Sequence, residues 1–208
     1  PMPFNGKSGK FNASINTVEF GCGDKAVKIG GENVFPLYSF DAAIENAPKV
    51  GIEITDFGME HEPECIKKYY EGCATLADMA RKAASMEGVD FLSFRMEGGD
   101  PNGANKSTEE LIGELKEIAD AVDLPLVVCG CKNVEKDAEL FSKAAEALNG
   151  KNAVILSAKE ENYKTVGAAA GLAYKQIVGA ESAVDINLAK QLNVLISQLG
   201  VDSKSVVM

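Results

Sequence analysis

Residues 124–129, Leu-Pro-Leu-Val-Val-Cys, decide the fold of this 208-residue chain. Almost every position of the segment is apolar, so both of its alternating faces are suited to burial, as in a parallel strand covered by helices. Segments 107–122 and 133–150, on either side, repeat apolar residues every three or four positions, which is typical of amphipathic helices. The segment therefore predicts a buried strand between two helices.

The same alternation of strand and helix extends in both directions along the chain. Further helices are expected over about 66–88, 159–174 and 185–200, with Asn133 and Asp185 suited to cap two of the helices. The expected strands are 50–55, 91–96, 124–129, 153–157, 176–180 and 205–208. Because helices separate all of these strands, they should be parallel, with right-handed crossovers.

Two architectures fit this order of elements, an open doubly wound sheet and a (β/α) barrel. The chain has no glycine-rich phosphate-binding motif of the Rossmann or P-loop kind. We therefore expect an α/β protein with a TIM-type barrel, incomplete at about five and a half of eight units. Residues 10–34 predict a β-hairpin. The expected division is an N-terminal arm with the hairpin over 1–46 and the incomplete barrel over 47–208.

Charge and composition exclude several classes of partner. The chain carries 21 Lys and Arg against 31 Asp and Glu, a net charge of −10, and 46% of its residues are hydrophobic. An acidic surface repels phosphate backbones and anionic lipids, so we expect neither nucleic acid nor a membrane as a partner. Residues 1–7 lack the apolar core of a secretory signal, so we expect a cytoplasmic protein.

The five cysteines indicate free thiols. An odd number of cysteines without a secretory signal is typical of a reducing compartment. Cys65 and Cys73 fall on one expected helix, about 12 Å apart along its axis, which is too far for one zinc ion. Cys129 and Cys131 are separated by one residue, and Cys22 lies in the expected hairpin turn. We therefore predict no metal ion and no iron–sulfur cluster on this chain.

The loops that follow the strands of a barrel form its functional face. Here these loops are 56–61, 97–105, 130–133, 158–163 and 181–185. The second loop is the most distinctive, because its glycines allow the backbone to approach a ligand closely. Glu53, Asp56, Glu97 and Glu161 could pair for acid–base chemistry. His61, the only histidine, is more simply a solvated loop residue.

Five segments resemble one protein family in order and spacing. They are residues 23–32, 51–56, 99–105, 134–137 and 185–193. The family is the small (delta) subunit of the corrinoid iron–sulfur protein, part of the acetyl-CoA synthase/CO dehydrogenase system. The resemblance runs from about residue 15 to the end and implies a TIM barrel related to pterin-binding methyltransferases. Family members continue past the point that matches Met208, so a sixth strand cut short is also expected.

The resemblance implies a subunit without independent turnover. In the family it forms a heterodimer with a large subunit that carries a corrinoid (cobalamin) and a [4Fe–4S] cluster. The cobalt receives a methyl group from methyltetrahydrofolate through a separate methyltransferase and passes it to acetyl-CoA synthase/CO dehydrogenase. This transfer belongs to the reductive acetyl-CoA (Wood–Ljungdahl) pathway of carbon fixation in anaerobes. The small subunit would form a wall of the corrinoid site at the interface with the large subunit.

By loop position, the resemblance places the corrinoid against three strand ends. The implied contact residues are Thr55, Asp56, Gly98, Gly99, Asp100, Asn102, Gly103, Asn105, Cys129, Gly130 and Cys131. Two alternatives remain open. One is a pterin-dependent methyltransferase on the same barrel, although residues 94–97 read Phe-Arg-Met-Glu where that family has the acid and asparagine that grip the pterin. The other is an unrelated barrel enzyme that uses Glu53, Asp56 and Glu97 as acid–base groups.

Overall fold

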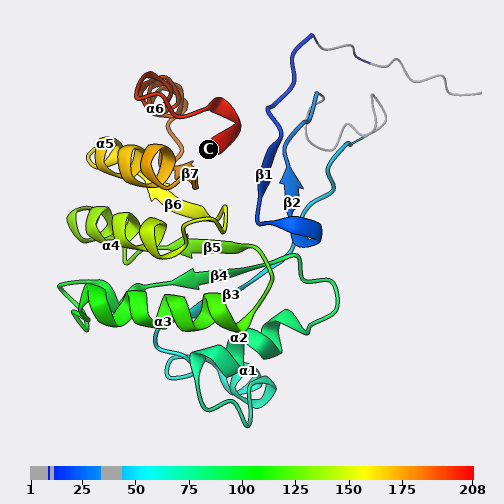
Figure 1. Ribbon diagram of the computed structural model, residues 1–208, viewed down its shortest axis with the longest axis vertical. Coiled ribbons are helices and arrows are strands. Elements are labelled where there is room, and N and C mark those ends of the chain that lie inside the picture. The colour runs from blue at the N-terminus through cyan, green and yellow to red at the C-terminus, as the bar shows by residue number, and fades with distance from the viewer. Residues whose placement is uncertain (1–8, 10–11, 34–43) are drawn as a thin grey trace, which may run out of the picture.

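Six parallel strands pair in chain order, each with the next along the sequence (Figure 1). The computed structural model describes residues 9, 12–33 and 44–208. Its parallel strands are β3 (Gly51–Thr55), β4 (Phe91–Arg95), β5 (Leu126–Cys129), β6 (Val154–Ala158), β7 (Ile177–Ala180) and β8 (Val206–Val207). The expected α/β class and the parallel pairing of the strands are confirmed.

Helices connect the strands, as the apolar periodicity predicts. They are α1 (Glu64–Tyr69), α2 (Leu76–Ala84), α3 (Thr108–Ala121), α4 (Val134–Ala147), α5 (Tyr163–Val166), the π-helix η3 (Gly167–Ala173) that continues α5, and α6 (Ile186–Gln198), with 3-10 turns η1 (Gly23–Lys25), η2 (Glu97–Gly99) and η4 (Ser203–Ser205). Side-chain oxygens of Ser107, Asn133 and Asp185 cap α3, α4 and α6 by accepting backbone amide hydrogens. Within the described residues, none of these helices is long and apolar enough to cross a membrane.

The first expected helix is in fact two helices. Gly72 adopts φ +87°, a left-handed conformation that stops α1 from continuing. Thr75 then begins α2, because its hydroxyl accepts the Asp78 amide hydrogen while the Asp78 carboxylate accepts the Thr75 amide hydrogen. Cys65 therefore lies on α1 and Cys73 in the turn that follows, so the expectation that both share one helix is wrong.

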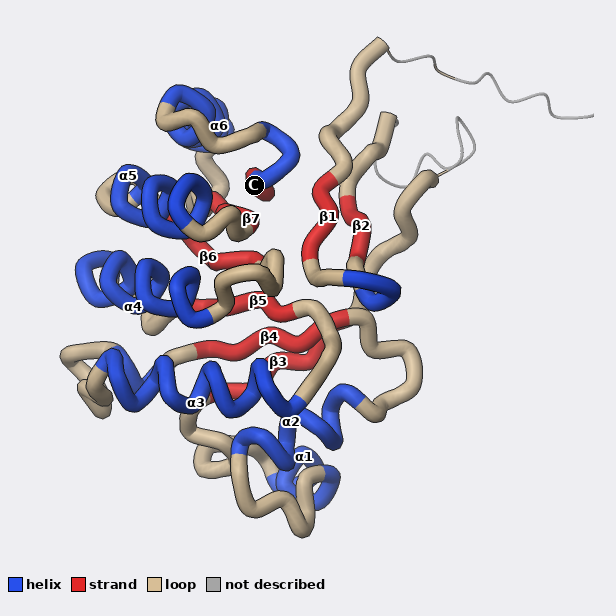
Figure 2. Tube along the Cα trace, in the orientation of Figure 1, coloured by secondary structure: helices blue, strands red, loops and turns tan. Residues whose placement is uncertain are grey.

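The helices cover one face of the sheet. Alternate strand residues such as Leu92, Phe94 and Val128 are fully buried in one apolar cluster with helical side chains such as Leu115 and Phe141. Figure 2 shows α3, α4, α5 and α6 stacked in chain order beside the strands. The residues between these positions in each strand face the opposite side of the sheet, because side chains alternate along a strand.

The expected hairpin covers part of that opposite side. β1 (Val18–Phe20) and β2 (Val27–Ile29) pair antiparallel, and they pack in a second apolar cluster against residues of β5, β6 and β7. The amide of Asn152, just before β6, donates to the carbonyl oxygens of Glu19 and Gly21 at 3.0 and 3.2 Å. The hairpin is thus fixed at the amino-terminal ends of the strands.

The expected N-terminal arm is only partly described. Residues 1–8, 10–11 and 34–43 lie outside the described residues. The first strand of the hairpin was expected from residue 11 and begins at Val18 instead. The division between 1–46 and 47–208 stays a prediction.

Candidate functional site

A guanidinium–carboxylate pair lies on the side of the sheet that faces away from the helices. Arg95, the last residue of β4, donates from Nε to Glu53 Oε1 at 2.9 Å and from Nη2 to Glu53 Oε2 at 3.0 Å. Ser93 Oγ donates to Glu53 Oε2 at 3.4 Å and lies 3.5 Å from Cys129 Sγ. The hydrogen bonds that Arg95 donates to Glu53 raise the pKa of Arg95, so the guanidinium remains charged in this two-pronged contact.

Two cavities open beside this pair, and we call them together the strand-end site. The larger has a volume of about 510 Å³ and the smaller about 260 Å³, and both are lined by Arg95, Leu156, Ser157 and Glu181. The remaining lining residues are Cys129, Ala180, Ser182, Ala183, Val184 and Met208 in the larger cavity and Gly130, Lys132, Asp137 and Lys159 in the smaller. The site therefore combines β4 with the ends of the next three strands.

Four charged groups at the strand-end site form two ion pairs. Glu181 Oε2 accepts a hydrogen bond from Ser157 Oγ at 2.7 Å and lies 3.7 Å from Lys159 Nζ. Arg95 forms a closer ion pair with Glu53, at 2.9 Å. Because these four charges are compensated inside the protein, the two pairs present hydrogen-bond donors and acceptors with little net charge. It suits a polar, uncharged surface on a ligand.

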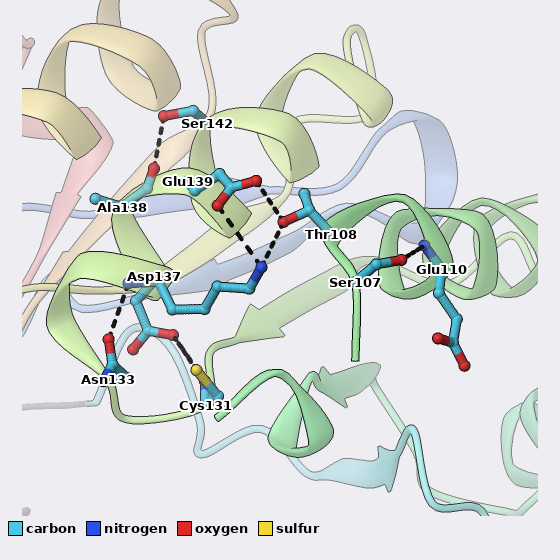
Figure 3. A network of polar contacts seen from close by, with 10 residues as sticks. Ser107, Thr108, Glu110, Cys131, Asn133, Asp137, Ala138, Glu139 and Ser142 are labelled. Carbon is cyan, nitrogen blue, oxygen red and sulfur yellow. Dashed lines mark hydrogen bonds and ion pairs between the residues drawn. The ribbon is translucent and has the colours of Figure 1, made fainter. Parts of the chain in front are cut away.

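Three predicted site residues, Cys129, Gly130 and Cys131, lie at the strand-end site or directly beneath it. The Cys131 amide and thiol donate to Asp137 Oδ1 at 2.7 and 3.2 Å (Figure 3). Burial raises the pKa of the Cys129 thiol, and it raises the pKa of the Cys131 thiol to about 11, so both thiols remain protonated at neutral pH. Gly99 packs close to Cys131 from the neighbouring loop.

Asp56 is turned toward the loop after β4. Its buried carboxylate accepts the Gly98 amide hydrogen at 2.9 Å. Lys106 Nζ forms an ion pair with Oδ2 at 3.0 Å, but the angles of this contact do not make it a hydrogen bond. Lys106 also donates to the Asp56 carbonyl at 3.0 Å and to Glu114 at 3.4 Å. Asp56 therefore holds this loop against the end of β3, where Thr55 is half-buried.

The other predicted residues belong to an exposed loop that bonds to itself. Asp100 Oδ1 accepts the Asn102 amide hydrogen at 2.9 Å, and the Asp100 carbonyl accepts those of Gly103 and Asn105 at 2.9 and 3.0 Å. The structure thus brings Asp56 together with Gly98. It places the other four, Asp100, Asn102, Gly103 and Asn105, at the tip of the loop. Their role as cofactor contacts stays a prediction.

Two of the four candidate acid–base residues, Glu53 and Asp56, are held by different cations. Glu53 is bonded to Arg95 and Asp56 to Lys106, so these two acids do not form a carboxylate pair with each other. The His61 ring packs edge-on against Phe57, with ring centroids 4.8 Å apart. In residues 9, 12–33 and 44–208, no three His, Cys, Asp or Glu side chains gather as a metal ion would require.

Glu114, which accepts a hydrogen bond from Lys106, makes the stability of the protein depend on pH. Burial raises the pKa of Glu114 above its ordinary value of 4.5, so the folded protein binds its proton more tightly than the unfolded chain. The stability that this group contributes is complete below pH 4.5 and is lost as the pH rises through the folded-state pKa. We expect Glu114→Gln to gain stability relative to the unchanged protein as the pH is raised through this range. Urea unfolding at several pH values measures the difference.

A matched control for this experiment is Glu117→Gln, an exposed acid on the same helix. Its unfolding free energy should follow that of the unchanged protein at every pH. A constant difference between Glu114→Gln and the unchanged protein across the range would contradict the prediction.

Sequence reasoning did not single out Arg95, Ser157, Lys159 or Glu181 as site residues. Arg95 carried a usable signal, because it interrupts the apolar pattern of a buried strand on the face that also holds Ser93. Its contact with Glu53 follows from the pairing of β3 with β4, in which Thr55 lies opposite Arg95.

A parallel sheet in chain order, with helices between its strands, defines a β/α-repeat protein, a class in which ligands commonly bind at the carboxyl ends of the strands. The model of the CO dehydrogenase/acetyl-CoA synthase delta subunit family matches residues 17–208, and the chain belongs to this family.

Archaeal relatives agree with this assignment. The chain is 30% identical to the acetyl-CoA decarbonylase/synthase complex subunit delta of Methanothermobacter thermautotrophicus, over 99% of this chain and 53% of that protein. It is also 30% identical to subunit delta of Methanocaldococcus jannaschii, over 96% and 50% of the two chains, and of Methanopyrus kandleri, over 90% and 47%. The chain thus spans about half the length of these relatives.

Proposed function

We propose that this chain is the barrel part of a methyl-carrier subunit in an acetyl-CoA decarbonylase/synthase complex, where it forms a wall of the corrinoid site without turning over substrate itself. The observation that carries the proposal is the strand-end site of a delta-subunit family member: a pocket whose Arg95 and Lys159 charges are already matched by Glu53 and Glu181. Groups paired in this way are suited to holding a ligand in place.

The topology supports the barrel. An open doubly wound sheet reverses its strand order and carries helices on both faces. Here β3 to β8 pair strictly in order, and the helices lie on one face, as the first five and a half units of a singly wound barrel would. On this proposal the strand-end site lies inside the rim of the barrel.

The strand-end site fits a corrinoid. Such a macrocycle has a wide apolar face and a rim of uncharged carboxamides, which need both donors and acceptors. The Glu53 contact uses two N–H groups of Arg95 and leaves three of its five as donors, while Glu181 can accept. Leu156, Val184 and Met208 provide apolar surface beside them. When bound, the corrinoid would supply the cobalt that carries the methyl group.

The proposed partners follow from this role. A large subunit with the corrinoid and a [4Fe–4S] cluster would cover the strand-end site, and a methyltetrahydrofolate methyltransferase and acetyl-CoA synthase/CO dehydrogenase would act on the assembled carrier. The printed names of the archaeal relatives, each a subunit of a decarbonylase/synthase complex, support a place in such an assembly.

The pterin-dependent methyltransferase is the weaker alternative. Glu53, the carboxylate on the inward side of the strands, is already bonded to the guanidinium of Arg95 through both of its oxygens. A pterin would have to share this carboxylate with Arg95.

Reconstitution with the large corrinoid subunit from the same source tests the proposal. We expect the two chains to co-purify with bound corrinoid, measured by visible absorbance and cobalt content. Arg95→Met should release the corrinoid about tenfold more readily, the change expected for loss of one charge-assisted hydrogen bond. Lys190→Met, on the exposed face of α6, is the matched control and should retain the corrinoid.

Two results would count against the proposal. One is failure of the two chains to associate. The other is binding of methyltetrahydrofolate by this chain alone at micromolar concentration, measured by calorimetry, which would favour the pterin alternative.

A further inference from the structure

We infer that Asp137 is the positioning residue of the strand-end site: its carboxylate fixes the loop after β5 so that Gly130 and Lys132 line the smaller cavity. The inference rests on the proposed function for the identity of the ligand. Its geometric part concerns this chain alone and can be tested without a ligand.

Asp137 is held in place by its helix. It lies in the first turns of α4, after the Asn133 cap, and the following residues Leu140 and Phe141 are buried in the main apolar cluster. Its side chain is therefore carried by a rigid element. The residue is 5% exposed, and its carboxylate reaches back over the loop to accept the amide and thiol hydrogens of Cys131 (Figure 3).

The loop is shaped around this carboxylate. A methyl group added at Gly130 would overlap both oxygens and the carboxyl carbon of Asp137, so the glycine is required for the close approach. The residue after Cys131, Lys132, adopts φ +69°, a left-handed conformation that a side-chain-bearing residue rarely adopts. Such a conformation persists where surrounding contacts hold it, and Asp137 supplies the contact next to it.

The charges around Asp137 explain why a carboxylate can remain buried here. Burial raises the pKa of Asp137 above its ordinary value of 3.8, while the hydrogen bonds from Cys131 and Lys132 and the nearby charge of Lys159 act against that rise. The protonated thiols of Cys129 and Cys131 are the other titratable groups next to it. Asp137 and the Lys159–Glu181 pair thus line the same smaller cavity.

Three substitutions test the inference. Asp137→Asn keeps an oxygen within reach of the Cys131 amide, Asp137→Ser removes it, and Glu135→Gln changes an exposed acid in the same turn of α4. The first measurement is hydrogen exchange of the Cys131 amide in the full chain, followed by NMR. The second is retention of hydroxocobalamin by the reconstituted complex with the large subunit.

We expect Asp137→Ser to speed exchange at Cys131 at least tenfold while leaving the amides of β5 unchanged, and to weaken corrinoid retention about tenfold. Asp137→Asn should restore both values most of the way, because the contact requires an acceptor rather than a charge. Glu135→Gln should match the unchanged protein. If the serine variant does not fold, Asp137→Glu, with its carboxylate displaced by one methylene, should show the same changes in weaker form.

Unchanged exchange at Cys131 in Asp137→Ser would overturn the inference. So would faster exchange without any loss of corrinoid, because the loop would then not serve the site. If the unchanged complex binds no corrinoid, the proposed function fails, whereas the exchange experiment still decides whether Asp137 holds the loop.

Discussion

Gly130→Ala is expected to destabilise the protein by about 3 kcal/mol, through overpacking and the loss of a buried hydrogen bond to a charged group. The added methyl group would overlap the Asp137 carboxylate, which is buried and cannot move into solvent. Either the carboxylate gives up the Cys131 amide, or the loop after β5 shifts. Urea unfolding followed by circular dichroism measures the loss.

Gly113→Ala is the matched control, because a methyl group at Gly113 on α3 meets no atom within 4 Å. It should leave stability unchanged or raise it by about 0.5–1 kcal/mol, since alanine has a higher helix propensity than glycine. Combining Gly130→Ala with Asp137→Ser should cost less than the sum of the two single changes, because the serine makes room for the methyl group. Equal effects of the two glycine substitutions would contradict the structure of this loop.

Phe20→Ala is expected to cost about 3–5 kcal/mol, the range for removal of a buried aromatic side chain. Phe20 is 3% exposed and packs edge-on against Phe91 of β4, with ring centroids 5.7 Å apart. Its loss should free the hairpin from the sheet as well as leave a cavity. Thermal unfolding gives the stability, and limited proteolysis near Gly23, in the hairpin turn, reports release of the hairpin.

Glu19→Ala tests the opposite side of the same strand. Glu19 is exposed and forms a surface ion pair with Lys28 at 3.4 Å, so its removal should change stability by no more than about 0.5 kcal/mol. If the two substitutions destabilise the protein equally, the hairpin would not be part of the apolar core.

The repeated strand–helix pattern was predictable because each unit carries its own signal. The apolar run 124–129 became β5, whose four residues are all buried, and Asn133 and Asp185 cap helices as their positions predicted. The break between α1 and α2 was missed because the apolar spacing continues across it. The break depends on the left-handed Gly72 and the reciprocal bonds of Thr75 and Asp78, which periodicity does not register.

The candidate site was less predictable, because it depends on contacts between distant residues. Gly130 and Asp56 are both predictable as strand-end loop residues, but Gly130 lines the strand-end site whereas Asp56 holds a loop. The Glu53–Arg95 contact joins residues 42 positions apart and requires the register of β3 against β4. A charged residue within an apolar strand was the available signal.

The position of the hairpin, at the amino-terminal ends of the strands, affects how partner proteins could reach a ligand at the strand-end site. Among the described residues it packs on the face of the sheet opposite the helices, and Asn152 binds it near the amino-terminal ends of the strands, whereas the strand-end site lies at their carboxyl ends. On the proposed function, the protein that delivers the methyl group and the protein that collects it would both reach the ligand from the carboxyl ends of the strands. Delivery and collection would then take turns, and a carrier occupied by one partner would be closed to the other.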